Sequence, residues 1–238
     1  MSVPIALDED FHVHSTFSDG ESTLAENVQA ARERGLRTLC LVDHVRRDTD
    51  WVPQFAAAVS GYHTEPGMRV LSGVEAKILD TSGALDLPSS LDGIDLVLIA
   101  DHRFPAEGNG SSPVHPADVR AAIEDGRLGA AEAIERLCGA TVAALGNVDR
   151  QPLLAHLFSV LPKVGLDEAM VPESMLAHLA ARLAQARAMV EVNEKWSCPS
   201  ARTVTALALA GTSLVASSDS HHCRDVGLYR SVRLAIGA

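Results

Sequence analysis

Seven short apolar segments, separated by stretches with helical periodicity, restrict most strongly how this chain can fold. Most of them are rich in leucine or β-branched residues and lack a clean polar–apolar alternation, which is typical of strands buried on both faces of a parallel sheet. The seven segments are residues 11–14, 38–42, 69–74, 96–100, 153–155, 189–192 and 213–217. Strands that alternate with helices indicate βα units, so we predict an α/β fold.

Helical patterns lie between several of these segments. Thr23 and Glu26 have the spacing of a capping box, which predicts the start of a helix. Further helices are predicted at residues 50–61, 128–145, 172–185 and 202–210. No linker-like Ser/Gly/Pro stretch divides the chain, and seven βα units favour a closed or nearly closed barrel. We expect a single barrel domain over residues 1–238, with a helical insertion around 103–150 and a small hairpin at 80–88.

Histidines and carboxylates gather at the ends of the predicted strands. In a parallel barrel these ends meet at one mouth, so six strands deliver imidazole or carboxylate groups to one place. A histidine cluster without a bound cation would repel itself on protonation. His12 and His14 leave the same face of their strand, and Asp219 and His221 repeat this spacing. The candidate metal ligands are His12, His14, Asp19, His44, Glu75, His102, His156, Asp219 and His221.

This ligand set exceeds what one ion needs. One ion takes about four to six ligands, and a carboxylate such as Glu75 can bridge two ions. We therefore predict two or three divalent ions, and mixed imidazole and carboxylate ligands suit zinc, manganese or iron. Three ions against three carboxylates leave a mouth of roughly +3, which attracts a small anion such as a phosphate ester. Asp43 and Asp101 precede His44 and His102, and we expect them to support these ligands from behind.

Composition limits the partners of the chain. Acidic residues outnumber basic ones by 31 to 20, which argues against a nucleic-acid binder. No apolar run approaches the roughly 18 residues of a membrane span. The four cysteines form no close pair for zinc, and the N-terminal segment lacks the basic region of a signal peptide. We expect a cytoplasmic protein that acts on a small phosphorylated substrate, without a membrane or nucleic acid as partner.

The strand-end motifs resemble those of the PHP (polymerase and histidinol phosphatase) superfamily. Residues 12–20 read HVHSTFSDG, which is similar to the first motif of that superfamily. The later motifs are matched in order by Asp43-His44, Gly73-Val74-Glu75, His102, His156 and Ser218-Asp219-Ser220-His221. The resemblance spans roughly residues 8–232 and implies a PHP-type, distorted (β/α)7 TIM-like barrel with a trinuclear metal site.

The resemblance also implies how the ligands divide among three ions. The first ion is assigned to His12, His14, Glu75 and Asp219; the second to Glu75, His102 and His156; the third to Asp19, His44 and His221. Because every ligand position carries an acceptable residue, we expect an active hydrolase, a metal-dependent phosphatase similar to histidinol phosphatases. A hydroxide that bridges the ions would attack phosphorus in line. Glu75, His102 and Asp219 are the predicted holders of this bridging water.

The sequence also suggests substrate contacts, and it leaves more than one reaction class open. The side chains next to the ligands that we predict to bind substrate are Arg46, Arg103, Asn193 and Lys195. The same centre would also serve a phosphodiesterase or nuclease. An amide or lactone hydrolase on this barrel would use a modified lysine, and Lys77 stands two residues after Glu75. A non-enzymatic, metal-loaded regulatory module is the remaining alternative.

Overall fold

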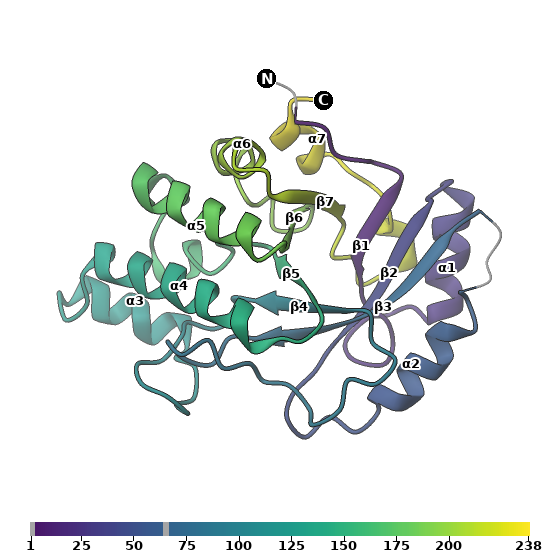
Figure 1. Cartoon of the computed structure of the whole chain (residues 1–238), viewed down its shortest axis with the longest axis horizontal. Helices are drawn as coiled ribbons and strands as arrows, with labels where there is room; N and C mark the ends of the chain where they lie inside the picture. Colours follow the sequence, from purple (N-terminus) through teal and green to yellow (C-terminus); the bar gives the residue numbers. More distant parts are fainter. Residues whose placement is uncertain (1–2, 64–66) are drawn as a thin grey trace.

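A seven-stranded parallel sheet organises the part of the chain described by the computed structural model, residues 3–63 and 67–238. The strands pair in sequence order: β1 (Glu9–Val13), β2 (Thr38–His44), β3 (Arg69–Lys77), β4 (Leu96–Ala100), β5 (Gln151–Ala155), β6 (Met189–Asn193) and β7 (Ser213–Ser217). A bridge between Val13 and Ser220 joins the end of β1 to the segment after β7. The sheet therefore forms a nearly closed barrel (Figure 1), and the predicted distorted (β/α)7 fold is confirmed.

Several strands run further than the sequence predicts, and the extension toward the mouth is largest in β2 and β3. β2 extends to His44 and β3 to Lys77, whereas the predicted segments end at the last apolar residue before the ligands. The backbone ladder continues because polar side chains at the mouth do not interrupt main-chain pairing. In the β2–β3 register, His44 lies directly beside Glu75. Strand pairing itself thus brings two predicted ligands together.

Seven α-helices and four short 3-10 helices connect the described strands. The α-helices are α1 (Leu24–Glu33), α2 (Val52–Ser60), α3 (Pro116–Glu124), α4 (Ala130–Ala144), α5 (Glu173–Gln185), α6 (Ala201–Leu209) and α7 (Ser231–Ile236). The 3-10 helices are η1 (Leu145–Asn147), η2 (Pro162–Val164), η3 (Glu168–Met170) and η4 (Cys223–Asp225). The predicted capping box is present, because the Thr23 side chain accepts from Glu26 N and Glu26 accepts from Thr23 N. No helix among the described residues is long and apolar enough to span a membrane.

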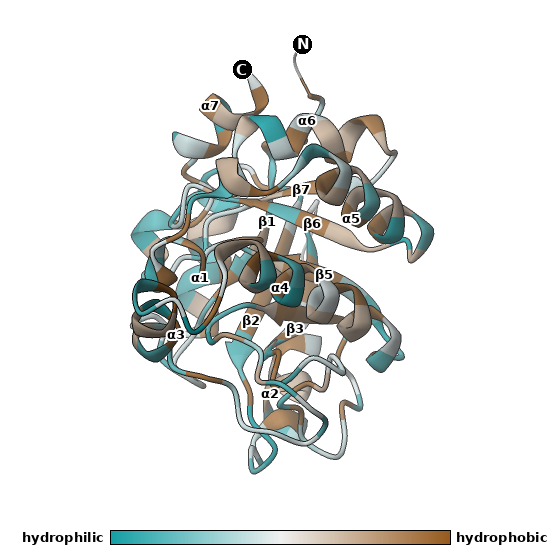
Figure 2. Ribbon diagram, turned by 90° about the vertical axis from the view of Figure 1, so that its left-hand side faces the viewer, coloured by the Kyte–Doolittle hydropathy of each residue, from teal (hydrophilic) through white to brown (hydrophobic). Residues whose placement is uncertain are grey.

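Apolar side chains fill the barrel below its mouth. This inner cluster consists of Phe11, Cys40, Val42, Leu71, Leu96, Leu98, Ala100, Leu153, Ala155 and Val215. Burial of one Leu or Phe side chain contributes about 1.5–3 kcal/mol. A larger apolar cluster lies between the strands and the surrounding helices. Figure 2 shows hydrophobic residues along the central strands and a mixture of hydrophobic and hydrophilic residues on α4, α5 and α6. The interior is packed, so polar chemistry is confined to the ends of the barrel.

The segment between β4 and β5 contains α3 and α4, which lie within residues 103–150. That this segment is an insertion in a single barrel domain stays a prediction. The hairpin predicted at 80–88 is smaller in the structure: a single antiparallel bridge joins Ile78 to Leu85. The turn of this hairpin packs against the C-terminal end of α4. Gly83, with φ of +75°, leaves so little space there that an added Cβ would lie 2.2 Å from the backbone nitrogen of Ala144.

We therefore expect Gly83→Ala to lower the free energy of unfolding by about 3 kcal/mol. A left-handed backbone costs a non-glycine residue about 1–2 kcal/mol, and overpacking adds about 1–3 kcal/mol. The matched control is Gly126→Ala, because Gly126 has φ of +73° with no atom within 4 Å of the added Cβ. Both variants place a non-glycine residue in the left-handed region, but only Gly83→Ala also overpacks. The difference between their free energies of unfolding, measured by urea denaturation, therefore gives the packing contribution. Equal losses of stability would contradict the close approach at Gly83.

Candidate metal centre

The carboxylate of Glu75 at the end of β3 is the centre of the candidate site. Five histidines have a ring nitrogen within 3.5 Å of it: His12, His14, His44, His102 and His156. Oε1 of Glu75 lies 2.9 Å from Nε2 of both His102 and His156. Oε2 lies 2.9 Å from Nδ1 of His44. Glu75 is only 1% exposed, so these groups interact with little screening by water.

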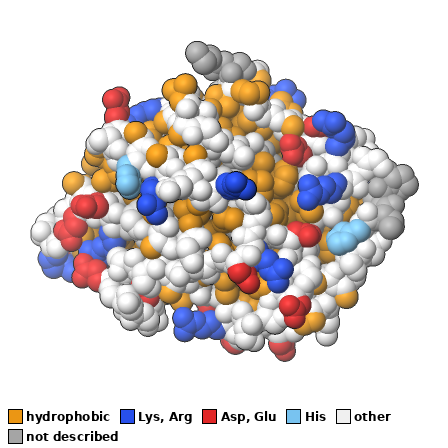
Figure 3. Space-filling view, viewed as in Figure 1, with side chains coloured by type: hydrophobic (Ala, Val, Ile, Leu, Met, Phe, Trp, Pro, Cys, Tyr) orange, Lys and Arg blue, Asp and Glu red, His pale blue; other side chains and the backbone are white. Residues whose placement is uncertain are grey.

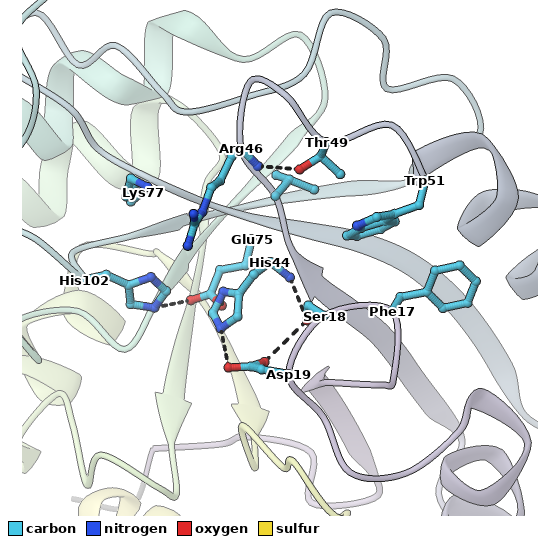
Figure 4. A pocket seen from close by; sticks show the side chains of 11 residues that line it. Phe17, Ser18, Asp19, His44, Arg46, Thr49, Trp51, Glu75, Lys77 and His102 are labelled. Atoms are coloured by element: carbon cyan, nitrogen blue, oxygen red, sulfur yellow. Dashed lines mark hydrogen bonds and ion pairs between the residues drawn. The ribbon is translucent and has the colours of Figure 1, made fainter.

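The other three predicted ligands lie beyond His14 and His44. His14 Nε2 and His221 Nδ1 are each 3.5 Å from Oδ1 of Asp219. Asp19 lies between rings, with one oxygen 3.4 Å from His44 Nε2 and the other 3.5 Å from His221 Nε2. Figure 4 shows Asp19, His44 and His102 around Glu75. The fold thus brings all nine predicted ligands to one end of the barrel.

Three overlapping groups of these side chains have ligand atoms within 4.8 Å of one another. They are His12, His14 and Asp219; His44, Glu75 and His102; and His14, Asp19, His44 and His221. The first and third resemble two of the ion sites implied by the family motifs. His156 lies outside these groups, although its Nε2 is 3.2 Å from Nε2 of His102. The division of ligands among individual ions stays a prediction.

Two carboxylates orient the rings of His12 and His156. Oε2 of Glu191 lies 3.0 Å from His12 Nδ1, and Oδ1 of Asp101 lies 3.2 Å from His156 Nδ1. A neutral ring that keeps its proton on Nδ1 has a lone pair on Nε2. Both Nε2 atoms face the carboxylate of Glu75, an arrangement that repels unless a cation lies near them. The donor set therefore fits divalent metal ions held by carboxylate-supported histidines.

Without a metal ion, protons supply the positive charge at this site. Burial alone lowers the pKa of an imidazole, but neighbouring carboxylates raise the pKa of His44 to about 9 and that of His156 to about 10. The carboxylates of Glu191 and Glu75 likewise raise the pKa of His12 well above its usual value. Since a metal ligand must be a neutral imidazole, metal binding has to displace these protons.

His14 behaves differently from its neighbours. Burial and the charge of His12 lower its pKa to about 3, although Asp219 acts in the opposite direction. The Nδ1 atom of His14 is buried without a hydrogen-bond partner. A buried polar atom left unpaired costs about 1–3 kcal/mol. A neutral imidazole whose buried Nδ1 has no hydrogen-bond partner is suited to bind a cation.

The aspartates that precede His44 and His102 lie behind the ligands, as expected. Asp43 accepts hydrogen bonds from the backbone of Ser15 and Ser18, both at 3.1 Å, and so fixes the loop that carries Asp19. Burial raises the pKa of Asp43 to about 6. Asp101 accepts from the Ser159 hydroxyl at 2.6 Å in addition to facing His156.

Glu191, which is fully buried on β6, is not among the predicted site residues. Besides facing His12, it accepts a hydrogen bond from the backbone of His156 and one from Asn193 Nδ2 at 2.7 Å. Asn193, predicted to contact substrate, is itself buried, and its Oδ1 accepts from Trp196 N at 2.8 Å. A substrate contact of Asn193 stays a prediction. The available signal was the two-residue spacing of Glu191 and Asn193, which places both on the same face of β6.

A cavity of about 540 Å³ opens beside the ligands on the β2–β3 side. Its walls are formed by Phe17, Ser18, Asp19, His44, Val45, Arg46, Thr49, Trp51, Glu75, Lys77 and His102. Figure 4 shows that Arg46 extends toward the His102 side and that Trp51 and Phe17 lie on the other. The cavity thus combines ligand atoms, positive charge and aromatic surface.

The predicted cationic contacts differ in their positions. Arg46 lines the cavity, whereas Arg103 is exposed and is not among the described residues that line it. Lys195 lies on the opposite side of the ligands, with Nζ 3.1 Å from His221 Nδ1 and 3.5 Å from Asp219 Oδ1. Arg46 and Lys195 therefore flank the candidate centre, and substrate binding by all of these residues stays a prediction.

The fold and the site together define a class of protein: a parallel barrel with a candidate metal site, built from histidines and carboxylates at the C-terminal ends of its strands. Within this class, the chain belongs to the PHP domain family, whose model matches residues 10–195. The resemblance inferred from the motifs is therefore confirmed.

Curated relatives and a solved structure agree with this family. The chain is 35% identical over 147 residues to a probable phosphatase of Vibrio cholerae serotype O1, covering 58% of this chain and 52% of the relative. It is 33% identical over 126 residues to a probable phosphatase of Aliivibrio fischeri, covering 50% and 49%. The chain thus spans about half the length of the curated relatives it matches. A histidinol phosphate phosphatase from Lactococcus lactis, crystallised with zinc, L-histidinol and phosphate, shares the fold with a TM-score of 0.67, 18% identity and coverage of 95% and 90%.

We expect His14→Ala to lower the metal content of the purified protein by at least one ion per chain, because His14 belongs to two of the three ligand groups. Elemental analysis measures this content directly. His178→Ala is the matched control, since His178 is exposed on α5. An unchanged metal content in His14→Ala would rule out the ligand role of this residue.

Zinc binding should release protons. At about pH 8, His44 and His156 are protonated in the metal-free protein because their pKa values are about 9 and about 10. Both must be neutral as ligands, and so must His12, whose pKa is also raised well above its usual value. At least two protons therefore leave, and the apparent zinc affinity falls as the pH is lowered. Calorimetric titration in two buffers with different ionisation enthalpies measures the released protons. Proton uptake would contradict the assignment.

Proposed function

We propose that this chain is a metal-dependent phosphatase that hydrolyses a small phosphate monoester with two or three zinc, manganese or iron ions. The observation that carries the proposal is the convergence of eight imidazole and carboxylate side chains around Glu75. Membership of the PHP family and the two relatives named probable phosphatases support the reaction class. Histidinol phosphate is the first substrate to test, since a protein of the same fold is a histidinol phosphate phosphatase.

We assign the ions to the nine side chains predicted as ligands. When bound, the ions would lower the pKa of a water molecule and neutralise charge on the attacking and leaving oxygens of the ester. Glu75 and His102, whose Oε1 and Nε2 atoms are 2.9 Å apart, would hold the attacking water together with Asp219. The reaction breaks the P–O bond and yields an alcohol and inorganic phosphate.

Two cations are placed to bind the phosphate from opposite sides. Arg46 lines the cavity next to His102, and Lys195 lies 3.5 Å from Asp219. Charge-assisted hydrogen bonds from such groups to phosphate oxygens are short and strong. Trp51 and Phe17, whose ring centroids are 5.6 Å apart, give the cavity an apolar wall for the alcohol portion.

One contact and the charge of the chain favour a phosphatase over the alternatives. Lys77, the candidate for a modified lysine in an amide or lactone hydrolase, has its Nζ 2.7 Å from the carboxylate of Asp86. A carboxylated lysine would be negatively charged there and would repel Asp86. A nuclease would favour a basic surface, whereas this chain has 31 acidic against 20 basic residues, and the one face drawn in Figure 3 shows both kinds interspersed. Arg46 and Lys195 are suited to one phosphate rather than a strand.

The direct test measures hydrolysis by the metal-loaded protein with p-nitrophenyl phosphate, histidinol phosphate and a labelled single-stranded DNA. We expect the monoesters to be hydrolysed and the strand to remain intact. Cleavage of the strand alone would replace the proposal by a nuclease. No hydrolysis of any phosphate ester with zinc, manganese or iron would favour a regulatory module.

Substitution of Arg46 tests the substrate side of the same proposal. Arg46→Ala should raise KM for the monoester about 10-fold or more, because a hydrogen bond to a charged group contributes about 1.5–3 kcal/mol. Arg47→Ala is the matched control: Arg47 is exposed and is not among the residues that form the cavity. Equal KM values in both variants would remove Arg46 from substrate binding.

A further inference from the structure

Trp196, in the loop after β6, makes a contact with the candidate metal centre that the sequence motifs do not indicate. Its indole Nε1 donates a hydrogen bond to Oδ2 of Asp219 at 2.9 Å. Its backbone N–H donates to Oδ1 of Asn193 at 2.8 Å, which fixes the start of the loop relative to β6. The side chain is 39% exposed, so its place at the mouth is not explained by burial in the core.

The two oxygens of Asp219 have different surroundings. Oδ2 faces two N–H donors, Trp196 Nε1 at 2.9 Å and Asn193 Nδ2 at 3.4 Å. Oδ1 faces the predicted ligands, with His14 Nε2 and His221 Nδ1 each at 3.5 Å, and Lys195 Nζ lies 3.5 Å from it as well. The neutral N–H donors thus hold Oδ2, and Oδ1 is directed at the place where the ligands meet.

Asp219 needs this support because its backbone conformation is unusual, so that hydrogen bonds have to orient its carboxylate. Its φ of 53° lies in the left-handed region, which costs a non-glycine residue about 1–3 kcal/mol and persists where surrounding contacts fix it. A carboxylate on such a turn can rotate about its last bond unless one oxygen is held. The strongest hydrogen bond to Oδ2 comes from Trp196.

The ring of Trp196 has a separate anchor. Nζ of Lys163, from η2 after β5, lies 4.0 Å from the ring centroid, a distance at which cation–π attraction is effective. This contact uses the face of the indole, whereas the contact with Asp219 uses its edge. The two contacts can therefore be removed one at a time.

We propose that Trp196 is a positioning residue of the metal site: its indole N–H holds Oδ2 of Asp219 so that Oδ1 is aimed at the ion shared with His12 and His14. The inference rests on the metal-ligand role of Asp219 in the proposed function, but not on which ester is hydrolysed. Loss of such a supporting contact typically lowers metal affinity about 10- to 100-fold.

Zinc titration of Trp196→Phe tests the inference. Phenylalanine keeps an aromatic ring for Lys163 but has no N–H, so we expect the affinity for one of the bound ions to fall about 10- to 100-fold and the others to stay unchanged. Lys163→Met, the matched control, keeps the N–H and should bind every ion as the unaltered protein does. Competition with a chromophoric chelator resolves the individual affinities, and circular dichroism during heating reports whether each variant is folded.

A fluorescence measurement gives a second, independent result. The chain has two tryptophans, so in Trp51→Phe the emission reports on Trp196 alone. We expect this emission to change as zinc binds.

Three outcomes would overturn the inference. They are unchanged affinities in Trp196→Phe, loss of all ions together with a lower melting temperature, and constant emission up to saturation. Failure of the proposed function gives a different result. Trp196→Phe would still lose one ion selectively, but the unaltered, metal-loaded protein would hydrolyse no monoester.

Discussion

A buried carboxylate in contact with five imidazoles is the interaction on which the mouth of this barrel depends. Removing a carboxylate from water costs several kcal/mol unless positive charge is close to it. Burial raises the pKa of Glu75, but His102 and His12 outweigh this effect and lower it well below its usual value. The histidines in turn need either protons or a metal cation to balance the carboxylates. The site is therefore an electrostatic unit in which each member determines the charge state of its neighbours.

Around this unit the mouth has two unlike sides. On the β2–β3 side, Arg46 and Trp51 line an open cavity next to the ligands. On the β6–β7 side, Lys195 and Trp196 lie directly against Asp219. The indole of Trp196 donates a hydrogen bond to a predicted ligand, whereas the indole of Trp51 forms part of a cavity wall. In the proposed function the two cations share one purpose, which is to bind the phosphate from opposite sides.

The sequence predicted the strands and the ligand cluster because both follow local rules. An apolar segment that ends in His44 or Glu75 identifies a strand and its mouth without knowledge of the partner strands. Glu191 was not assigned because its spacing from Asn193 indicates a face of β6 but not a partner, and its contact with His12 joins positions 179 residues apart. Trp196 escaped it as well, since its role depends on the turn that brings an indole edge to Asp219. Strand ends were predictable, whereas the hydrogen bonds that orient the ligands required the three-dimensional structure.

The seam between β1 and β7 has a consequence for how the protein is made. Asp10 at β1 accepts hydrogen bonds from the backbone of Ser218 and Gly227, and the backbone N–H of His14 donates to Ser220. Ligand side chains from the first and the seventh strand therefore come together only across this seam. During synthesis on the ribosome, the half-formed barrel holds an incomplete set of donors until its last strand emerges. Completion of the two ligand groups that contain His14 is thereby coupled to closure of the fold, whereas His44, Glu75 and His102 come together without the last strand.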